Sequence, residues 1–180
     1  IEEASKAPDW DRLLVLHAWG GRKKEGLYSF LCSQYGLSPK TLYEARNMSD
    51  PYQYIFSDFL SKKKDEIQPI FDMVLIDEAQ DFPPFFETIY YITKEPKRII
   101  WAYDEFQSLN ELKISDPETL FGTDKDGNPN MSNDSIKGQY EDGIDKDYML
   151  PNSYRNPRKV LLYAHGLGLG LYSERAKVPM

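Results

Sequence analysis

The chain has 180 residues, 29 of them acidic and 22 basic, which gives a formal net charge of −7. This length suits one ordinary core or two small lobes, and the acidic balance argues against a broad basic face for nucleic-acid phosphates. The single cysteine, Cys32, excludes an internal disulfide framework and a cysteine-based zinc site. The sequence shows no apolar stretch that could span a bilayer and no charged leader before an apolar segment, so we expect a cytoplasmic protein without membrane contact.

The first part of the chain is predicted to form one strand and then a small helical module. Residues 12–18 are mostly apolar and stop at two glycines, which is typical of a buried strand, so residues 1–21 are expected to contribute a core strand. From 22 to 70, aromatic and aliphatic residues recur three and four positions apart, which predicts an inserted helical subdomain. Ser38-Pro39 and Asp50-Pro51 have the pattern of an N-cap followed by proline in the first helical turn.

A strand–helix–strand unit is predicted for residues 71–114. Four large apolar residues at 73–76 are typical of a strand that is buried on both faces of a parallel sheet. An amphipathic helix is expected at 85–93 and a second strand at 98–103, so the two strands would run parallel. The predicted fold class is therefore α/β.

The remainder of the chain is less regular. Residues 115–148 are rich in Asp, Asn, Gly and Ser, which predicts a long acidic surface excursion or a partly disordered loop. A short strand is expected around 148–150, and a helix begins at about residue 158 within the last segment, 149–180.

Two carboxylates follow the first predicted strand of the parallel unit. The carboxyl ends of strands in α/β sheets border the crevice where ligands bind, and Asp77 and Glu78 lie there. Mg²⁺ in nucleotide sites takes one or two carboxylates together with substrate phosphates. Asp77 therefore fits a magnesium ligand and Glu78 fits the base for an attacking water. For an Asp-Glu pair alone, a solvated acidic turn is an equally good interpretation.

Polar groups follow the second predicted strand and recur near the end of the chain. Gln107 has an amide that could donate to a γ-phosphate, and Asp104 could hold Gln107 or the water shell of the metal. Tyr154 and Arg155 offer a stacking ring and a cation for transition-state charge. The alternatives are a polar turn at 104–107 and a surface ion pair at Arg155.

Taken in order, these segments resemble the UvrD/Rep-type superfamily I DNA helicases. Asp77-Glu78-Ala79-Gln80-Asp81 is similar to motif II, Asp104 through Gln107-Ser108-Leu109 to motif III, and Leu150 through Tyr154-Arg155 to motif IV. The segment around His17 is similar to a diverged motif Ib. The resemblance implies the first RecA-like domain of a P-loop NTPase, with its parallel sheet and an inserted helical subdomain, as a fragment of a larger helicase or translocase.

The resemblance also implies roles for the residues that carry it. Asp77 would bind Mg²⁺ and Glu78 would be the general base of ATP hydrolysis. Gln80 and Gln107 would sense the γ-phosphate and couple it to DNA, with Asp104 beside them.

Other implied contacts are with the base and the nucleic acid. Tyr154 would stack on adenine and Arg155 would contact the γ-phosphate. His17 and the run Lys62, Lys63 and Lys64 would meet DNA, single-stranded or partly duplex, alongside the remaining helicase domains. A packed strand-end histidine and a solvated helix end are the alternatives for these two sites.

The sequence also departs from the family pattern. Tyr103 stands where motif III usually has glycine, and the Gly-x-x-x-x-Gly-Lys-Ser/Thr phosphate loop does not occur in these 180 residues. We therefore expect that the chain alone neither binds ATP tightly nor hydrolyses it. A degenerate NTPase-like binding or regulatory module is the main alternative. A Mg²⁺-dependent nuclease built on Asp77, Glu78 and Asp81 is a weaker one.

Overall fold

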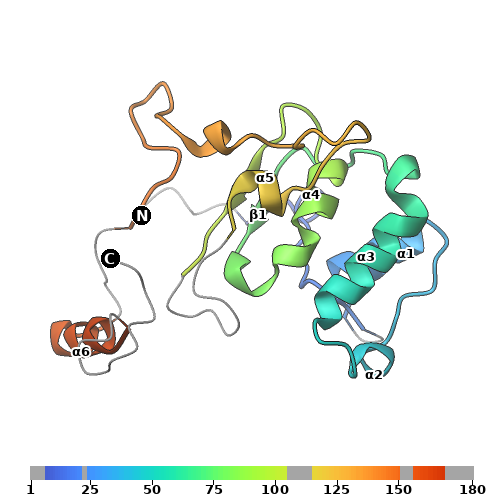
Figure 1. The fold of residues 1–180 in the computed structure, drawn as a ribbon, viewed down its shortest axis with the longest axis horizontal. Coiled ribbons are helices and arrows are strands. Elements are labelled where there is room, and N and C mark those ends of the chain that lie inside the picture. The colour runs from blue at the N-terminus through green and yellow to red at the C-terminus, as the bar shows by residue number, and fades with distance from the viewer. Residues whose placement is uncertain (1–6, 22–23, 105–114, 151–155, 169–180) are drawn as a thin grey trace. The chain divides into compact units, whose positions relative to one another are not determined.

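The computed structural model describes residues 7–21, 24–104, 115–150 and 156–168, and the chain divides into two compact units, residues 1–67 and 68–180 (Figure 1). Helices and a two-stranded parallel sheet are both present, so the predicted mixed α/β class is confirmed at this level. Over the described ranges, none of the helices combines the length and apolarity that crossing a membrane requires.

The first unit is a small helical module, as its periodicity predicted. It contains α1 (Leu27–Gln34), α2 (Leu42–Ala45) and α3 (Pro51–Lys63), followed by the 3₁₀ turn η1 (Lys64–Glu66). The start of α3 was predicted correctly, because the Asp50 carboxylate accepts a hydrogen bond from the Gln53 backbone N–H at 2.9 Å.

The start of α2 was predicted wrongly. Thr41, and not Ser38, is its N-cap, and the Thr41 N–H donates a hydrogen bond to the Glu44 carboxylate at 2.7 Å. This reciprocal capping box satisfies two backbone donors at once. A proline at position 39 is therefore outside the helix.

Aromatic packing holds the first unit together. Tyr28, Phe56 and Phe59 are fully buried, and the rings of Tyr28 and Phe56 meet edge to face with centroids 5.8 Å apart. The Tyr28 hydroxyl accepts a hydrogen bond from the Lys40 N–H at 3.1 Å, so the polar end of this buried ring has a partner. α1 and α3 thus share one core, and the assignment of 22–70 as an inserted subdomain stays a prediction.

The buried strand predicted at residues 12–18 does not form. Leu13, Leu14 and Val15 are exposed, and the segment makes one isolated bridge, between His17 and Gly26. Residues 17–19 instead use their carbonyl groups to accept the first three N–H groups of α1, at 2.8 to 3.0 Å. These donors have no partner within the helix, so the segment caps α1 and does not extend a sheet.

The second unit is built on a parallel pair of strands, as predicted. β1 (Val74–Ile76) pairs with β2 (Ile99–Trp101), with Leu75 opposite Ile100. The segment that connects the two strands contains the 3₁₀ turns η2 (Ala79–Asp81) and η3 (Pro83–Phe85) and the helix α4 (Phe86–Ile92).

Only one face of this sheet is buried, which corrects the prediction for 73–76. Ile76 and Ile99 are buried, and Trp101 contacts Phe86 edge to face at 6.0 Å. On the opposite face Leu75 is 69% exposed and Ile100 is 53% exposed. Every residue of the run 73–76 is apolar, but α4 and its neighbours pack against alternate residues only, because successive side chains of a strand point to opposite faces.

The acidic excursion at 115–148 is partly packed. It contains α5 (Pro117–Leu120) and the 3₁₀ turn η5 (Asn133–Ile136). Phe121 is fully buried and its ring contacts Phe86 at 5.3 Å and Trp101 at 5.6 Å. Its first residues thus belong to the core, while most residues after Phe121 are exposed, as expected of a surface excursion.

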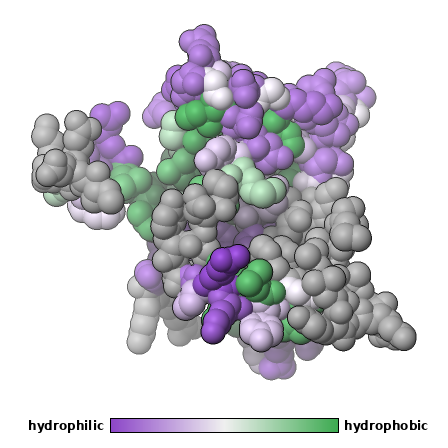
Figure 2. Space-filling view, turned by 90° about the vertical axis from the view of Figure 1, so that its left-hand side faces the viewer, coloured by the Kyte–Doolittle hydropathy of each residue, from purple (hydrophilic) through white to green (hydrophobic). Residues whose placement is uncertain are grey.

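The strand predicted around 148–150 does not form among the described residues, and Met149 and Leu150 are largely exposed. A strand needs a neighbour for its backbone groups, which local apolarity cannot supply. The last described element, α6 (Arg158–Gly168), is the helix that the sequence predicted. It also presents exposed apolar side chains, and Figure 2 shows apolar residues at the surface among hydrophilic ones.

Candidate functional site

The candidate site lies where β1 ends. The Ile76 carbonyl accepts a hydrogen bond from the Ala102 N–H at 2.8 Å, and the Ala102 carbonyl accepts one from the Ala79 N–H at 2.9 Å. Both ends of the intervening dipeptide are thus tied to one residue that follows β2. Asp77 and Glu78 bulge out of the ladder between these two bonds, and both are exposed. The sequence prediction that the two carboxylates stand at a strand end is confirmed in this respect.

The backbone at Glu78 has an unusual conformation. Its φ of 52° and ψ of 45° lie in the left-handed region, which costs a residue with a side chain on the order of 1 kcal/mol. The Glu78 N–H donates to the Asp77 carboxylate at 3.1 Å. Strain of this kind persists where surrounding contacts hold it, and it concentrates at functional sites.

Gln80 makes the contacts that surround Glu78. Its side-chain nitrogen donates to the Glu78 carboxylate at 2.7 Å, and its side-chain oxygen accepts from the Asp104 backbone N–H at 3.0 Å. The residue is only 8% exposed. Gln80 therefore connects the acidic turn after β1 with the first residues after β2, and three predicted site residues come together.

A small residue makes this approach possible. Ala79 is fully buried between the two acids and Gln80, and its N–H bonds directly to the backbone after β2. Phe82 and Phe85 follow, with ring centroids 5.7 Å apart. Ala79 was predicted only as part of the motif II-like segment, and its packing and its hydrogen bond to Ala102 were not predicted; the sequence signal for this contact is an alanine shortly after each strand.

The carboxylates fit a magnesium ion only with help from a substrate. Among the described residues no three His, Cys, Asp or Glu side chains are grouped to hold a metal by themselves. Magnesium usually keeps several waters and binds through one or two carboxylates plus phosphate oxygens. The exposed Asp77 carboxylate suits that mode, because its outer side faces solvent.

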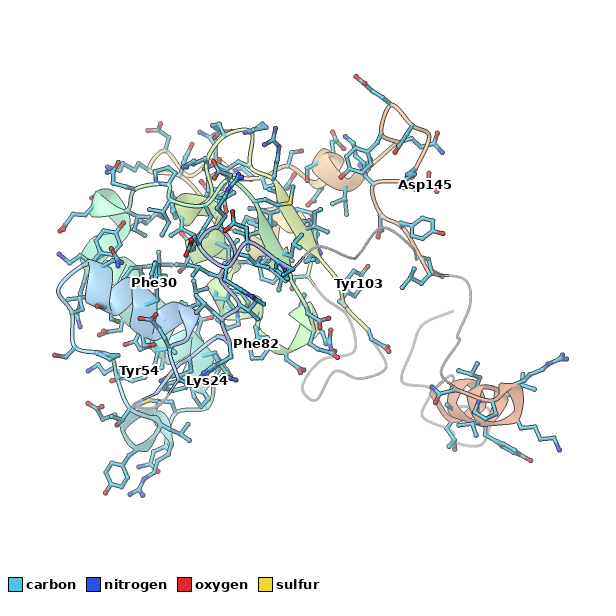
Figure 3. The ribbon with its side chains drawn as sticks, turned by 180° about the vertical axis from the view of Figure 1, so that it is seen from behind. Lys24, Phe30, Tyr54, Phe82, Tyr103 and Asp145 are labelled. Carbon is cyan, nitrogen blue, oxygen red and sulfur yellow. The ribbon has the colours of Figure 1, made fainter. Side chains whose placement is uncertain are left out.

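The end of β2 is described only as far as Asp104. Tyr103 is partly exposed at this end (Figure 3), and Asp104 is half-buried. Gln107, Tyr154 and Arg155 lie outside the described residues, so their predicted roles stay predictions.

The predicted nucleic-acid residues belong to the first unit. His17 is exposed, its Nδ1 accepts from the Gly20 N–H at 3.3 Å, and its carbonyl caps α1, so it is not a packed strand-end histidine. Lys62 pairs with Asp58 at 2.7 Å and Lys63 with Glu66 at 2.8 Å. These local ion pairs agree with a solvated helix end, and the DNA role of the lysines stays a prediction.

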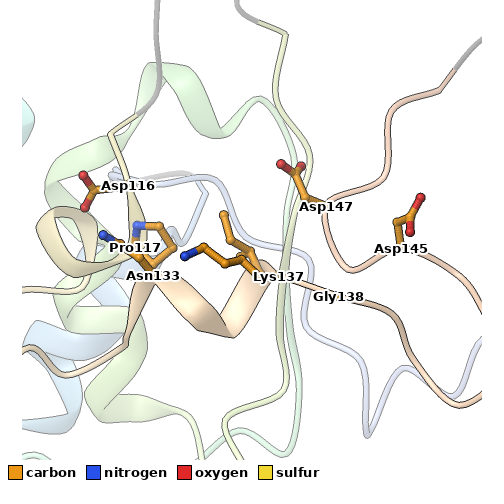
Figure 4. Close-up of a pocket in the computed structure, with 8 residues that line it drawn as sticks. Asp116, Pro117, Asn133, Lys137, Gly138, Asp145 and Asp147 are labelled. Atoms are coloured by element: carbon orange, nitrogen blue, oxygen red, sulfur yellow. The ribbon is translucent and has the colours of Figure 1, made fainter.

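A separate hollow lies in the second unit beside the start of α5 (Figure 4). Asp116, Lys137, Asp145 and Asp147 are among its lining residues. Lys137 is paired with Asp134 at 2.7 Å. The lining contains none of the predicted site residues, and the predicted carboxylate pair lies instead in the turn after β1.

Asp77, Glu78 and Gln80 therefore form one hydrogen-bonded group at the end of β1. Comparison of the chain with protein-family models, curated proteins and solved structures gives no match in any of the three.

Proposed function

We propose that this chain supplies the hydrolytic side of the Mg·ATP site in a UvrD/Rep-type superfamily I DNA helicase or translocase. The observation that supports it is the Gln80 bridge, because it joins the motif II-like acids to the start of the motif III-like segment at the carboxyl ends of adjacent parallel strands. Residues 71–180 would then belong to the first RecA-like domain and 22–70 to its helical insertion. DNA and the other helicase domains would be its partners.

The residues of the turn would divide the chemistry between them. ATP and Mg²⁺ would bring the γ-phosphoryl group and the charge that stabilises its transfer. Asp77 would hold the magnesium through its exposed carboxylate. Glu78 would accept the proton of the water that attacks the γ-phosphorus, as the bond to the ADP oxygen breaks.

The test is Glu78→Gln in a polypeptide that carries these residues together with a phosphate-binding loop. We expect DNA-stimulated ATP hydrolysis to fall at least 100-fold, within the range by which removal of a general base slows a reaction, with ATP affinity unchanged. Gln keeps the size of the side chain and removes the base, and Asp77 is left intact. Glu141→Gln, at an exposed acid of the acidic excursion, is the matched control and should keep full activity.

The rival proposal is a degenerate NTPase-like module that binds or regulates without catalysis. Tyr103 at the motif III-like position and the missing phosphate loop favour it. ATP hydrolysis at the unsubstituted rate by the Glu78→Gln protein would show that Glu78 is not the general base. The absence of any ATP hydrolysis in the unsubstituted protein would favour the rival. The isolated 180 residues should show no ATPase activity, and Glu78-dependent activity from them would contradict the expected need for a phosphate loop.

A further inference from the structure

The amide of Gln80 is used at both ends inside the protein. Its nitrogen is 2.7 Å from the Glu78 carboxylate and its oxygen is 3.0 Å from the Asp104 nitrogen. With 8% of the residue exposed, this amide is directed into the protein. The side-chain nitrogen carries a second N–H, but a direct contact with a γ-phosphate would have to reach an amide that is almost entirely buried and that the bond to the Glu78 carboxylate already orients.

We infer that Gln80 is a positioning residue, which holds the Glu78 carboxylate in place and does not itself sense the γ-phosphate. This inference rests on the proposed function and replaces the γ-phosphate-sensing role that the resemblance implied for Gln80. Gln80 acts on the reaction only through Glu78, and it ties that residue to the backbone after β2.

The backbone of Glu78 explains why such a residue is needed. A glutamate in the left-handed region is displaced from the conformations that it prefers. The hydrogen bond from the Ala79 N–H to the Ala102 carbonyl fixes the backbone of the turn, and Gln80 fixes the Glu78 side chain. A general base must keep hydrogen-bond distance to its proton, so a carboxylate that is free to rotate loses rate and not affinity.

Two substitutions of Gln80 test its two side-chain hydrogen bonds separately. Gln80→Glu keeps an oxygen for the Asp104 N–H, but it removes the donor to Glu78 and adds a second negative charge. Gln80→Met has similar length and removes both hydrogen bonds. Gln139→Glu is the matched control, because Gln139 also donates its amide to a carboxylate, that of Asp145 at 2.8 Å, on an exposed segment.

The first measurement is NMR hydrogen exchange on the 180-residue chain. We expect the Asp104 amide to stay protected in Gln80→Glu and to exchange at least tenfold faster in Gln80→Met. The side-chain NH₂ signals of Gln80 should be displaced from those of exposed glutamines. Spectra of β1 and β2 amides report whether each variant keeps its fold.

The second measurement is steady-state hydrolysis by the polypeptide that includes the phosphate loop. Both Gln80 variants should lower kcat at least tenfold and change KM for ATP by less than twofold, while Gln139→Glu changes neither. A rise in KM or in nucleotide Kd with kcat retained would overturn the inference, because it would indicate a direct phosphate contact. Unchanged Asp104 exchange in Gln80→Met would overturn it as well. If the unsubstituted protein hydrolyses no ATP, the proposed function fails and this role fails with it, whereas full activity in both variants overturns this role alone.

Discussion

The side-chain oxygen of Gln80 lies 3.0 Å from the backbone nitrogen of Asp104, across 24 positions of sequence. This one hydrogen bond joins the segments that follow the two parallel strands. Because the other end of the same amide contacts Glu78, the acidic turn and the end of β2 form a single structural group. The contact also assigns Gln80 a role inside the turn.

The close approach behind this group makes Ala79 intolerant of larger side chains. Ala79→Val adds two methyl groups where Ala79 is fully buried, and overpacking of this kind costs about 1–3 kcal/mol. We expect urea denaturation to show this loss of unfolding free energy. The control is Ala102→Val, at the exposed residue that follows β2, which should change stability by less than about 0.5 kcal/mol. Equal effects at the two alanines would contradict the packing described.

Phe121 tests whether the acidic excursion starts within the core. Its ring contacts Phe86 and Trp101 under the buried face of the sheet. Phe121→Ala should lower the free energy of unfolding by about 3–5 kcal/mol, as for other buried phenylalanines. Tyr140→Ala, at an exposed aromatic of the same excursion, should stay within about 0.5 kcal/mol of the unsubstituted chain. A small effect at Phe121 would mean that the segment is only a surface loop.

The turn at Asp124 should respond to acid. The Asn128 backbone N–H, at 2.8 Å, is the main cause that lowers the pKa of the Asp124 carboxyl, and the Asp126 N–H adds to it. Because the pKa of this carboxyl is lower in the folded state than in the unfolded state, its ionised form stabilises the turn at pH values above the usual aspartate pKa of about 4. This contribution is lost as the pH falls through the lowered pKa.

The measurement is an NMR titration of the Asp126 and Asn128 amide shifts. Both amides should follow one transition, below the usual aspartate range. Asp124→Asn keeps an acceptor oxygen but has no charge, so its two amide shifts should not titrate with this carboxyl. Titration of the unsubstituted chain within the ordinary range would show that the turn does not hold the ionised form.

Local signals in the sequence identified the elements that depend on local interactions. The cap at Asp50, the helices of the first unit and the α6 helix follow from side chains a few positions apart, whose hydrogen bonds and periodicity are short-range. The position of Asp77 and Glu78 at the end of β1 follows in the same way, because an apolar run that stops at two acids marks a strand end.

Errors arose where a distant partner decides the outcome. Residues 12–18 have the composition of a strand, but their last carbonyls cap α1. The run 73–76 is apolar throughout, yet Leu75 is exposed because α4 packs against alternate residues. Phe121 looks like part of a polar loop, and only its contacts with Phe86 and Trp101 bring it into the core.

The sequence by itself therefore determined the α/β class, the parallel strand pair and the acidic residues at the end of its first strand. Tertiary structure alone decided that Glu78 is left-handed, that Ala79 approaches Ala102, and that Gln80 is bonded at both ends. The physical reason is range: periodicity and capping act within a few residues, whereas the direction of a side-chain amide depends on a donor that the fold brings from the neighbouring strand.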